Sequence, residues 1–276
     1  MGPGRLRVAT AALAVALASS GAPVSAVAAP ASAVAAPSSA GVPFATPPLV
    51  LAPRTTSARR LTPPALLPLG SLYADPATGR RERILGDLAR TAVLIGDSQS
   101  EPTDSWVRRG LEKAGYSVYF AGKGGTGFSV GTAAVHDYDD ALRLGDWLLP
   151  YGDPGLVVVQ GGGNDASRRS SDAAITKGAV AILDELRTAY PHSKRLMVGT
   201  LSKSAAEGGG RRTEVDALLG RTAARLDVPF VGCGDWISRY GLADELADGV
   251  HLKASGMARL TPIFADSLAA QGLALD

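Results

Sequence analysis

The chain after residue 60 alternates between short apolar runs and longer amphipathic segments. Five of the runs are rich in β-branched or aromatic residues and are bounded by Gly, Asp or Asn, which is typical of buried strands. These predicted strands are residues 92–95, 117–120, 156–159, 195–198 and 229–231. Helical spacing of apolar positions in the segments beside them predicts helices over residues 106–114, 139–149, 173–189, 214–226 and 254–270.

This alternation predicts the fold class. Strands that read as continuous apolar runs are buried on both faces, and helices of this length are the crossovers that a parallel sheet requires. We therefore expect a three-layer α/β/α domain with a parallel sheet of about five strands. Residues 61–90 are expected to form an N-terminal extension of this domain, with a short helix at residues 81–88.

The first 60 residues have a different character. Two arginines precede an apolar run over residues 8–18, and small residues follow it, an order typical of a secretory signal peptide. The run is too short to span a bilayer, although an uncleaved signal anchor is the alternative. We expect residues 1–28 to be the signal peptide. Residues 29–60, rich in Ala, Pro and Ser, predict a disordered tether, because this composition buries little apolar surface. The folded domain is then residues 61–276, and the protein is secreted, either free or associated with the cell wall.

Composition and charge narrow the classes of partner. With 46% hydrophobic and 20% charged residues, the chain of 276 residues has a globular balance. None of the 26 acidic residues but five of the 28 basic residues lie in the first 60, so the domain carries 23 basic against 26 acidic residues, a net charge of −3. A domain with this slight negative charge is not expected to present a nucleic-acid-binding surface. No later segment resembles a membrane span, so we expect no stable membrane insertion after signal cleavage.

The single cysteine, Cys233, cannot form an internal disulfide. It lies in an apolar stretch over residues 229–234, where a buried inert thiol is expected.

Glycine-rich and polar segments follow the predicted strands. In open α/β sheets the ligand crevice lies beyond the carboxyl ends of the strands, so these segments should meet. They are Gly96-Asp97-Ser98 and the residues 122–131, 161–165 and 248–251. Together they supply a hydroxyl group, backbone amides, a carboxamide, and an imidazole with a carboxylate, which are the groups that acyl transfer uses.

Ser98 is the candidate nucleophile, and it needs a base because a serine hydroxyl is a weak nucleophile until an imidazole takes its proton. His251 is the candidate base, whereas His136 and His192 lie in segments that are expected to be solvated. Asp248 stands three residues before His251, a spacing that lets one turn bring the carboxylate to the imidazole. A helix cap is the alternative role for Asp248.

Asn164 could donate its side-chain N–H to an oxyanion, although a turn residue after three glycines is the alternative interpretation. The sequence GKGGTG at residues 122–127 matches the dinucleotide-binding pattern G-x-G-x-x-G, but it follows the second predicted strand and no acidic residue ends the next one. A nucleotide-binding module is therefore the weaker hypothesis. The loop of residues 202–212, with Lys203 and two arginines, either rims the site or is a solvated surface loop.

Four blocks in this order resemble the SGNH (GDSL-like) hydrolase superfamily in its secreted bacterial form. They are Ile95-Gly96-Asp97-Ser98, the glycine block at residues 122–131, Gly162-Gly163-Asn164-Asp165, and the final Asp248-x-x-His251. The resemblance implies a flavodoxin-like sheet, and a carboxylesterase or acetylesterase that uses a serine nucleophile without metal or cofactor.

The resemblance also implies roles for single residues. Ser98 is the nucleophile and first oxyanion donor, Asn164 is another donor, and His251 is the base oriented by Asp248. The remaining donor is Gly127, which is preferred because Phe and Ser follow it as in the family, with Gly125 as the alternative. The supporting residues are Asp97, Gly163 and Asp165.

The function expected on these grounds is secreted serine ester hydrolysis of short-chain acyl or acetyl esters. The substrate is either a small molecule or a carbohydrate or cell-wall polymer. Only 5% of the residues are aromatic, and no long apolar lid insertion is present, which favours soluble esters over triglycerides. The alternatives are a lipase or acyltransferase of the same fold and a catalytically silent domain that binds glycan. The oligomeric state is open, with a monomer expected.

Overall fold

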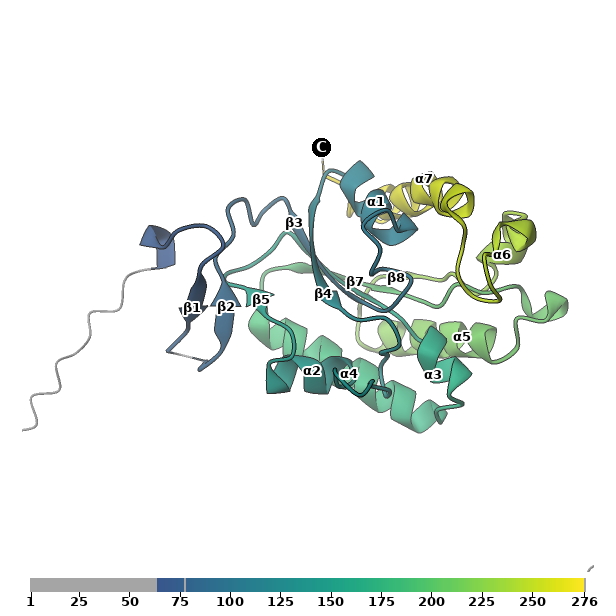
Figure 1. Cartoon of the computed structure of the whole chain (residues 1–276), viewed down its shortest axis with the longest axis horizontal. Helices are drawn as coiled ribbons and strands as arrows, with labels where there is room; N and C mark the ends of the chain where they lie inside the picture. Colours follow the sequence, from purple (N-terminus) through teal and green to yellow (C-terminus); the bar gives the residue numbers. More distant parts are fainter. Residues whose placement is uncertain (1–63, 77, 276) are drawn as a thin grey trace, which may run out of the picture. The chain divides into compact units, whose positions relative to one another are not determined.

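The main feature of the computed structural model is a five-stranded sheet (Figure 1). The structure describes residues 64–76 and 78–275, so the predicted signal peptide and tether lie outside the described residues. In spatial order the strands are β4 (Ser117–Gly122), β3 (Thr91–Gly96), β6 (Leu156–Gln160), β7 (Lys194–Val198) and β8 (Phe230–Val231). All neighbouring strands are parallel, which confirms the predicted α/β fold.

The order of the strands places a crevice beside β3. The chain passes from β3 to its neighbour β4 on one side and then crosses back to β6 on the other side. At such a reversal the loops that leave two adjacent strands diverge, which opens a crevice at their carboxyl ends. The segments that begin at Asp97 and Gly161 leave the sheet at this point.

Helices cover both faces of the sheet (Figure 1). One face carries α1 (Trp106–Lys113) and α7 (Ala254–Ala270). The other carries α2 (Tyr138–Leu144), α4 (Asp172–Ala189) and α5 (Gly210–Arg225).

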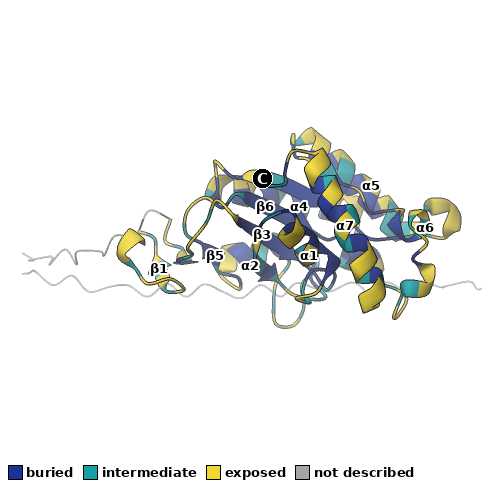
Figure 2. Cartoon of the chain, turned by 90° about the horizontal axis from the view of Figure 1, so that it is seen from above, coloured by how far each residue is buried: buried dark blue, intermediate teal, exposed yellow. Residues whose placement is uncertain are grey.

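Residues of β3 alternate between the two layers of the core. Val93 and Ile95 pack with the face of α2, α4 and α5, whereas Ala92 and Leu94 pack with the face of α1 and α7. Every residue of β3 is buried, and Figure 2 shows the buried interior between the two helical layers. Burial on both faces explains why these strands read as continuous apolar runs rather than as alternating ones.

Shorter elements complete the described part. The helix α3 (Gly163–Ser167) and the helix α6 (Trp236–Arg239) lie after β6 and β8, and three 3₁₀ turns are η1 (Pro64–Leu66), η2 (Ala205–Glu207) and η3 (Ala243–Glu245). A separate small sheet contains β1 (Leu72–Ala74), β2 (Arg81–Arg83) and β5 (Leu149–Pro150). The strand β2 pairs antiparallel with β1 and parallel with β5.

The predicted helix at residues 81–88 is wrong, because its first residues form β2. Glu82 of this strand is buried while Arg81 is exposed, an alternation that suits a strand paired on both sides. Strand pairing with distant β5 is a tertiary contact that local helix propensity does not anticipate.

The observed ends of the helices are set by the residues that cap them. The predicted helix over residues 139–149 ends at Leu144, because Gly145 takes a left-handed conformation with φ of 81° and ends it. Ser105 and Ser171 accept hydrogen bonds from the first turns of α1 and α4, and these helices agree with the prediction within one residue. None of the helices in residues 64–76 and 78–275 is long and apolar enough to cross a membrane.

Cys233 is buried, as predicted, and burial raises the pKa of its thiol well above its usual value.

Replacing Gly178 of α4 with alanine should destabilise the fold. In an exposed helix this change adds about 1 kcal/mol of stability. Here the new Cβ would overlap the backbone carbonyl of Phe128, which has no side-chain freedom to move away. We expect the free energy of unfolding to fall by about 1–3 kcal/mol, measured by urea denaturation.

The control is Gly86→Ala, whose Cβ would approach only the end of the Leu69 side chain, at 3.7 Å. An unchanged denaturation midpoint for Gly178→Ala would contradict the close contact between α4 and the loop of Phe128.

Candidate active site

The nucleophile candidate Ser98 lies two residues beyond β3. The amides of Ser100 and Glu101 both donate to the carbonyl of Asp97, at 2.9 Å each, which closes a tight turn around Ser98. The Oγ of Ser98 lies 2.8 Å from Nε2 of His251. Folding thus brings two residues that are 153 positions apart in the sequence into hydrogen-bond contact.

Asp248 holds the imidazole of His251 from its other side. Its Oδ2 lies 2.8 Å from Nδ1 of His251, and its Oδ1 accepts the backbone N–H groups of Val250 and His251 at 2.7 Å each. The bond to the imidazole, and then the two amides, hold the pKa of Asp248 well below its usual range. An ionised Asp248 favours the imidazole tautomer with hydrogen on Nδ1, which leaves Nε2 to accept the Ser98 hydroxyl.

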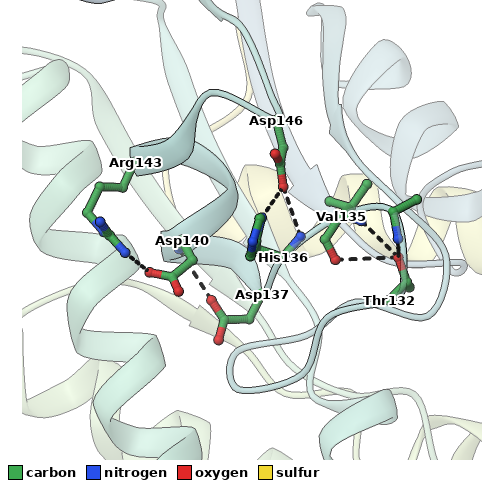
Figure 3. A network of polar contacts seen from close by, with 8 residues as sticks. Thr132, Val135, His136, Asp137, Asp140, Arg143 and Asp146 are labelled. Carbon is green, nitrogen blue, oxygen red and sulfur yellow. Dashed lines mark hydrogen bonds and ion pairs between the residues drawn. The ribbon is translucent and has the colours of Figure 1, made fainter.

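The other two histidines lie apart from this arrangement. His136 pairs through Nδ1 with Oδ2 of Asp146 at 2.7 Å, and its side chain is 54% exposed (Figure 3). The exposed His192 donates its backbone N–H to Asp153 at 3.4 Å. In the described part of the chain neither imidazole bonds to a serine hydroxyl, so His251 alone of the three meets the geometry that a serine base needs.

Asn164 lies at the start of α3. Its Nδ2 donates to the carbonyl of Thr126 at 2.9 Å and makes a longer contact with Oδ2 of Asp97 at 3.4 Å. The first bond fixes one amide hydrogen, so the orientation of the second is fixed as well. The carboxamide is therefore preorganised, and its second hydrogen is held only by the long bond to Asp97, which a better-placed acceptor can replace.

The glycine block is anchored by a buried carboxylate. Asp165 is fully buried and accepts hydrogen bonds from the amides of Phe128 and Ser129 at 3.0 and 2.8 Å, and from the Ser129 hydroxyl at 2.7 Å. An added Cβ at Gly127 would overlap Oδ2 of this carboxylate, which accounts for the glycine there. Asp165 therefore supports the site by joining the loops that follow β4 and β6.

The backbone amides of the glycine block differ in whether they already have a hydrogen-bond partner. The N–H of Gly127 already donates to the carbonyl of Val130 at 2.8 Å, and that of Gly124 donates to Glu101 at 2.8 Å. In the part of the chain that the structure describes, the amides of Gly125 and Ser98 have no hydrogen-bond partner. Of the two glycines considered, Gly125 is thus the one whose N–H is free to meet a substrate in this structure.

Several residues beside the site were not singled out from the sequence. Gln99 donates through Nε2 to the carbonyl of Val250 at 3.0 Å, which joins the turn of Ser98 to the loop of His251. With the Gln160 amide oriented to satisfy both of its ends, its nitrogen lies 3.2 Å from Oδ1 of Asp97. Gln99 directly follows the nucleophile and Gln160 ends a buried strand, and these positions are the signals that could have identified them.

Asp97 is almost fully buried beneath Ser98. Burial raises the pKa of its carboxyl to about 6, although the amide of Gln99, at 2.9 Å from Oδ1, and the charge of Arg212 act in the opposite direction. Arg212 itself donates to the carbonyl groups of Leu201 and Gly163 at 3.2 Å each, and burial lowers the pKa of its guanidinium. Gly163 is therefore a supporting residue through its backbone.

An acidic cluster lies elsewhere. Asp137, Asp139 and Asp140 can bring one carboxylate oxygen each within 4.8 Å of one another. Two of them already have partners, since Asp137 accepts the amide of Asp140 as a helix cap and Asp140 pairs with Arg143 at 2.6 Å (Figure 3). Helix capping and surface pairing thus account for the cluster.

A cavity of about 420 Å³ lies between β2 and the end of α2. Arg80, Glu82 and Arg143 are among its lining residues, and none of the residues of the Ser98 site is. This cavity is large enough to hold a small molecule, but the groups that can perform acyl transfer lie beyond β3 and β6.

Asp97 should make stability depend on pH. Its folded pKa of about 6 exceeds the ordinary value of 3.8, so the folded state holds the proton more tightly. The resulting stabilisation is full below about pH 4 and is lost as pH rises through 6, by about 3 kcal/mol. We expect Asp97→Asn to gain stability relative to the original chain between pH 4 and pH 7, measured by urea denaturation at both values.

Asp216, whose pKa burial also raises to about 6, is present in both chains and cancels in this comparison. An equal difference between the two chains at pH 4 and pH 7 would show that Asp97 does not titrate in this range.

Comparisons with known proteins concern the same region. Residues 90–259 match the model of the GDSL-like lipase/acylhydrolase family. A search of curated proteins found no match. Among solved structures, the chain resembles the inhibitor-bound form of the aryl esterase of M. smegmatis, with 17% identity, a TM-score of 0.50, and coverage of 66% of this chain and 99% of that one.

Two carbohydrate esterases are also similar in structure. An active-site mutant of a family two carbohydrate esterase from Clostridium thermocellum shares 14% identity with a TM-score of 0.51, over 68% of this chain and 66% of that one. A family 2 carbohydrate esterase with a carbohydrate-binding domain, from Corynascus thermopiles (Myceliophthora fergusii), shares 17% identity with a TM-score of 0.50, over 70% of each chain. At such identities these likenesses concern the fold, whereas the family model covers more than half of the sequence and includes all four motif blocks. The chain belongs to the GDSL-like lipase/acylhydrolase family.

Proposed function

We propose that this protein is a serine ester hydrolase that acts through an acyl-enzyme on Ser98. The observation that carries the proposal is the continuous hydrogen-bonded chain from the Ser98 hydroxyl through the imidazole of His251 to Asp248, with 2.8 Å at each step. This order of nucleophile, base and orienting carboxylate is what nucleophilic acyl transfer requires.

Each step uses a group of this chain. Ser98 Oγ bonds to the ester carbonyl carbon while Nε2 of His251 takes its proton. The amides of Ser98 and Gly125 and the Nδ2 of Asn164 are the proposed donors to the oxyanion. The imidazolium then protonates the leaving alcohol as the carbon–oxygen bond breaks. Water, deprotonated by the same nitrogen, releases the acid and restores Ser98.

The proposed substrates are short-chain acyl or acetyl esters on small molecules or carbohydrate polymers. The side chains of His251 and Asp248 are 41% and 58% exposed, so the site is open and can accept an ester that projects from a larger molecule. Structural neighbours named as carbohydrate esterases and as an aryl esterase support this range. The signal-like residues 1–28 support an extracellular place of action.

Replacing Ser98 with alanine should abolish hydrolysis. We expect kcat for 4-nitrophenyl acetate to fall by roughly 10³-fold or more, because the remaining groups supply binding and oxyanion donors but no nucleophile. A series of 4-nitrophenyl esters from acetate to long acyl chains would show the preference for short acyl groups.

Ser117→Ala, at an exposed position that begins β4, is the matched control and should keep full activity. Retained activity in Ser98→Ala would place the nucleophile elsewhere, and turnover of long-chain esters alone would contradict the proposed substrate class.

Asp248→Asn tests the orienting carboxylate. The pKa of Asp248 lies far below its usual range, so this carboxylate stays ionised across the pH range of activity. The acid side of the pH–rate profile should therefore report protonation of His251, with activity lost on acidification. We expect the variant to lose roughly 10²-fold in kcat, since nothing then fixes the tautomer of the imidazole.

Steady-state rates between pH 4 and pH 9 provide the measurement. A flat profile down to pH 4, or a variant with unchanged kcat, would contradict this role for the pair.

A further inference from the structure

A small cavity adjoins the loop that carries His251. Its volume is about 180 Å³, and it lies between the loop that follows β7 and the segment that precedes His251. Gly249 and Val250 form part of one wall, and Lys203 and Arg212 form part of the other. The mechanism proposed above uses none of the side chains in this cavity.

The lining of the cavity is cationic. Lys203 and Arg212 are its two charged residues, and no carboxylate lines it. The carbonyl of Lys203 accepts the Thr213 hydroxyl at 2.7 Å, but its ammonium group has no hydrogen bond or ion pair with any residue in 64–76 or 78–275. Arg212 is different, because the charge of buried Asp97 lies close enough to influence its guanidinium. Lys203 is therefore the positive charge that the surrounding residues leave without compensation.

The position of the cavity relates it to the leaving group of the reaction. His251 must deliver its proton to the oxygen of the departing alcohol, so this part of the ester lies on the side of the imidazole. Val250, adjacent to His251, lines the cavity and is tied to the nucleophile turn through the bond from Gln99 to its carbonyl. On the opposite wall Arg212 contacts the carbonyl of Gly163, the residue before Asn164.

We propose that this cavity binds a carboxylate on the alcohol part of the substrate, with Lys203 as the residue that determines this specificity. The inference rests on the proposed ester hydrolase function and narrows its substrate class to acyl esters of alcohols that carry a carboxylate, as an acidic sugar does. One uncompensated lysine among the residues that line a small cavity suits a group with a single negative charge better than a doubly charged phosphate. Attraction between the two charges lowers KM without a direct effect on the reacting atoms.

The test compares two acetate esters of the same shape, 4-acetoxybenzoate and its uncharged counterpart 4-acetoxybenzamide. Lys203 is the residue to change, because removing Arg212 would also leave two backbone carbonyl groups without their donor. We expect Lys203→Met to lower kcat/KM for the charged ester by about fivefold, mainly through KM, for a screened charge pair at contact distance. Lys203→Glu should lower it by about 25-fold because the attraction becomes repulsion.

Both variants should act on the uncharged ester within about twofold of the original chain, since no charge pair is involved. Lys113→Met is the matched control. Lys113 is the last residue of α1, and the chain continues from there into β4, at the opposite edge of the sheet. Removing its charge should change the rate with neither ester. Added sodium chloride should reduce the preference for the charged ester in the original chain only.

Three outcomes would overturn the inference. If the two esters respond equally to both Lys203 variants, or if Lys113→Met has the same effect as Lys203→Met, then Lys203 does not bind the carboxylate. In either case continued Ser98-dependent hydrolysis of 4-acetoxybenzamide would leave the proposed function intact. If the original, folded chain hydrolyses neither ester nor 4-nitrophenyl acetate, the proposed function fails and this inference fails with it.

Discussion

Burial of β3 on both of its faces and both of its edges is the constraint on which the site depends. The strand lies between β4 and β6, and all of its residues are buried. A strand in this position cannot shift by one residue without moving its apolar side chains to the wrong layer of the core. Its carboxyl end, and with it the turn of Ser98, is therefore held in one place relative to the helices on either side.

Buried carboxylates join the loops around this point. Asp165 accepts three hydrogen bonds from the glycine block, and Asp216 accepts the amides of Thr200 and Cys233 at 3.0 Å each. Burial of a carboxylate is costly unless hydrogen bonds compensate it, and the raised pKa of Asp216 shows that the compensation is incomplete. These residues therefore position the loops of the site at some expense to stability.

The His251–Asp248 pair presents the opposite situation, because both side chains are substantially exposed. Water weakens the attraction between exposed charges, so the pair gains little from a low dielectric. Geometry compensates for this, since the carboxylate of Asp248 is held by two backbone N–H groups of the same turn. The cavity of Lys203 borders the same loop at Gly249 and Val250.

The sequence alone identified the strands of the five-stranded sheet, most helices and the catalytic candidates, because each depends on local patterns. Apolar runs mark buried strands, and the spacing from Asp248 to His251 lets one turn bring them together. Local patterns failed where strand pairing decides the outcome: β2 is a strand because it pairs with β1 on one edge and with β5, far along the chain, on the other.

Dependence on folded neighbours also explains why the sequence could not decide between Gly125 and Gly127 as the oxyanion donor. Both glycines are equally available in the sequence. Only the folded loop shows that Val130 already occupies the Gly127 amide. The contacts of Gln99 with Val250 and of Arg212 with Gly163 likewise join segments far apart in the chain. The sequence determined which chemical groups this protein has at its strand ends, and the tertiary structure decided which of their hydrogen-bonding atoms are free, because that depends on neighbours that only folding brings together.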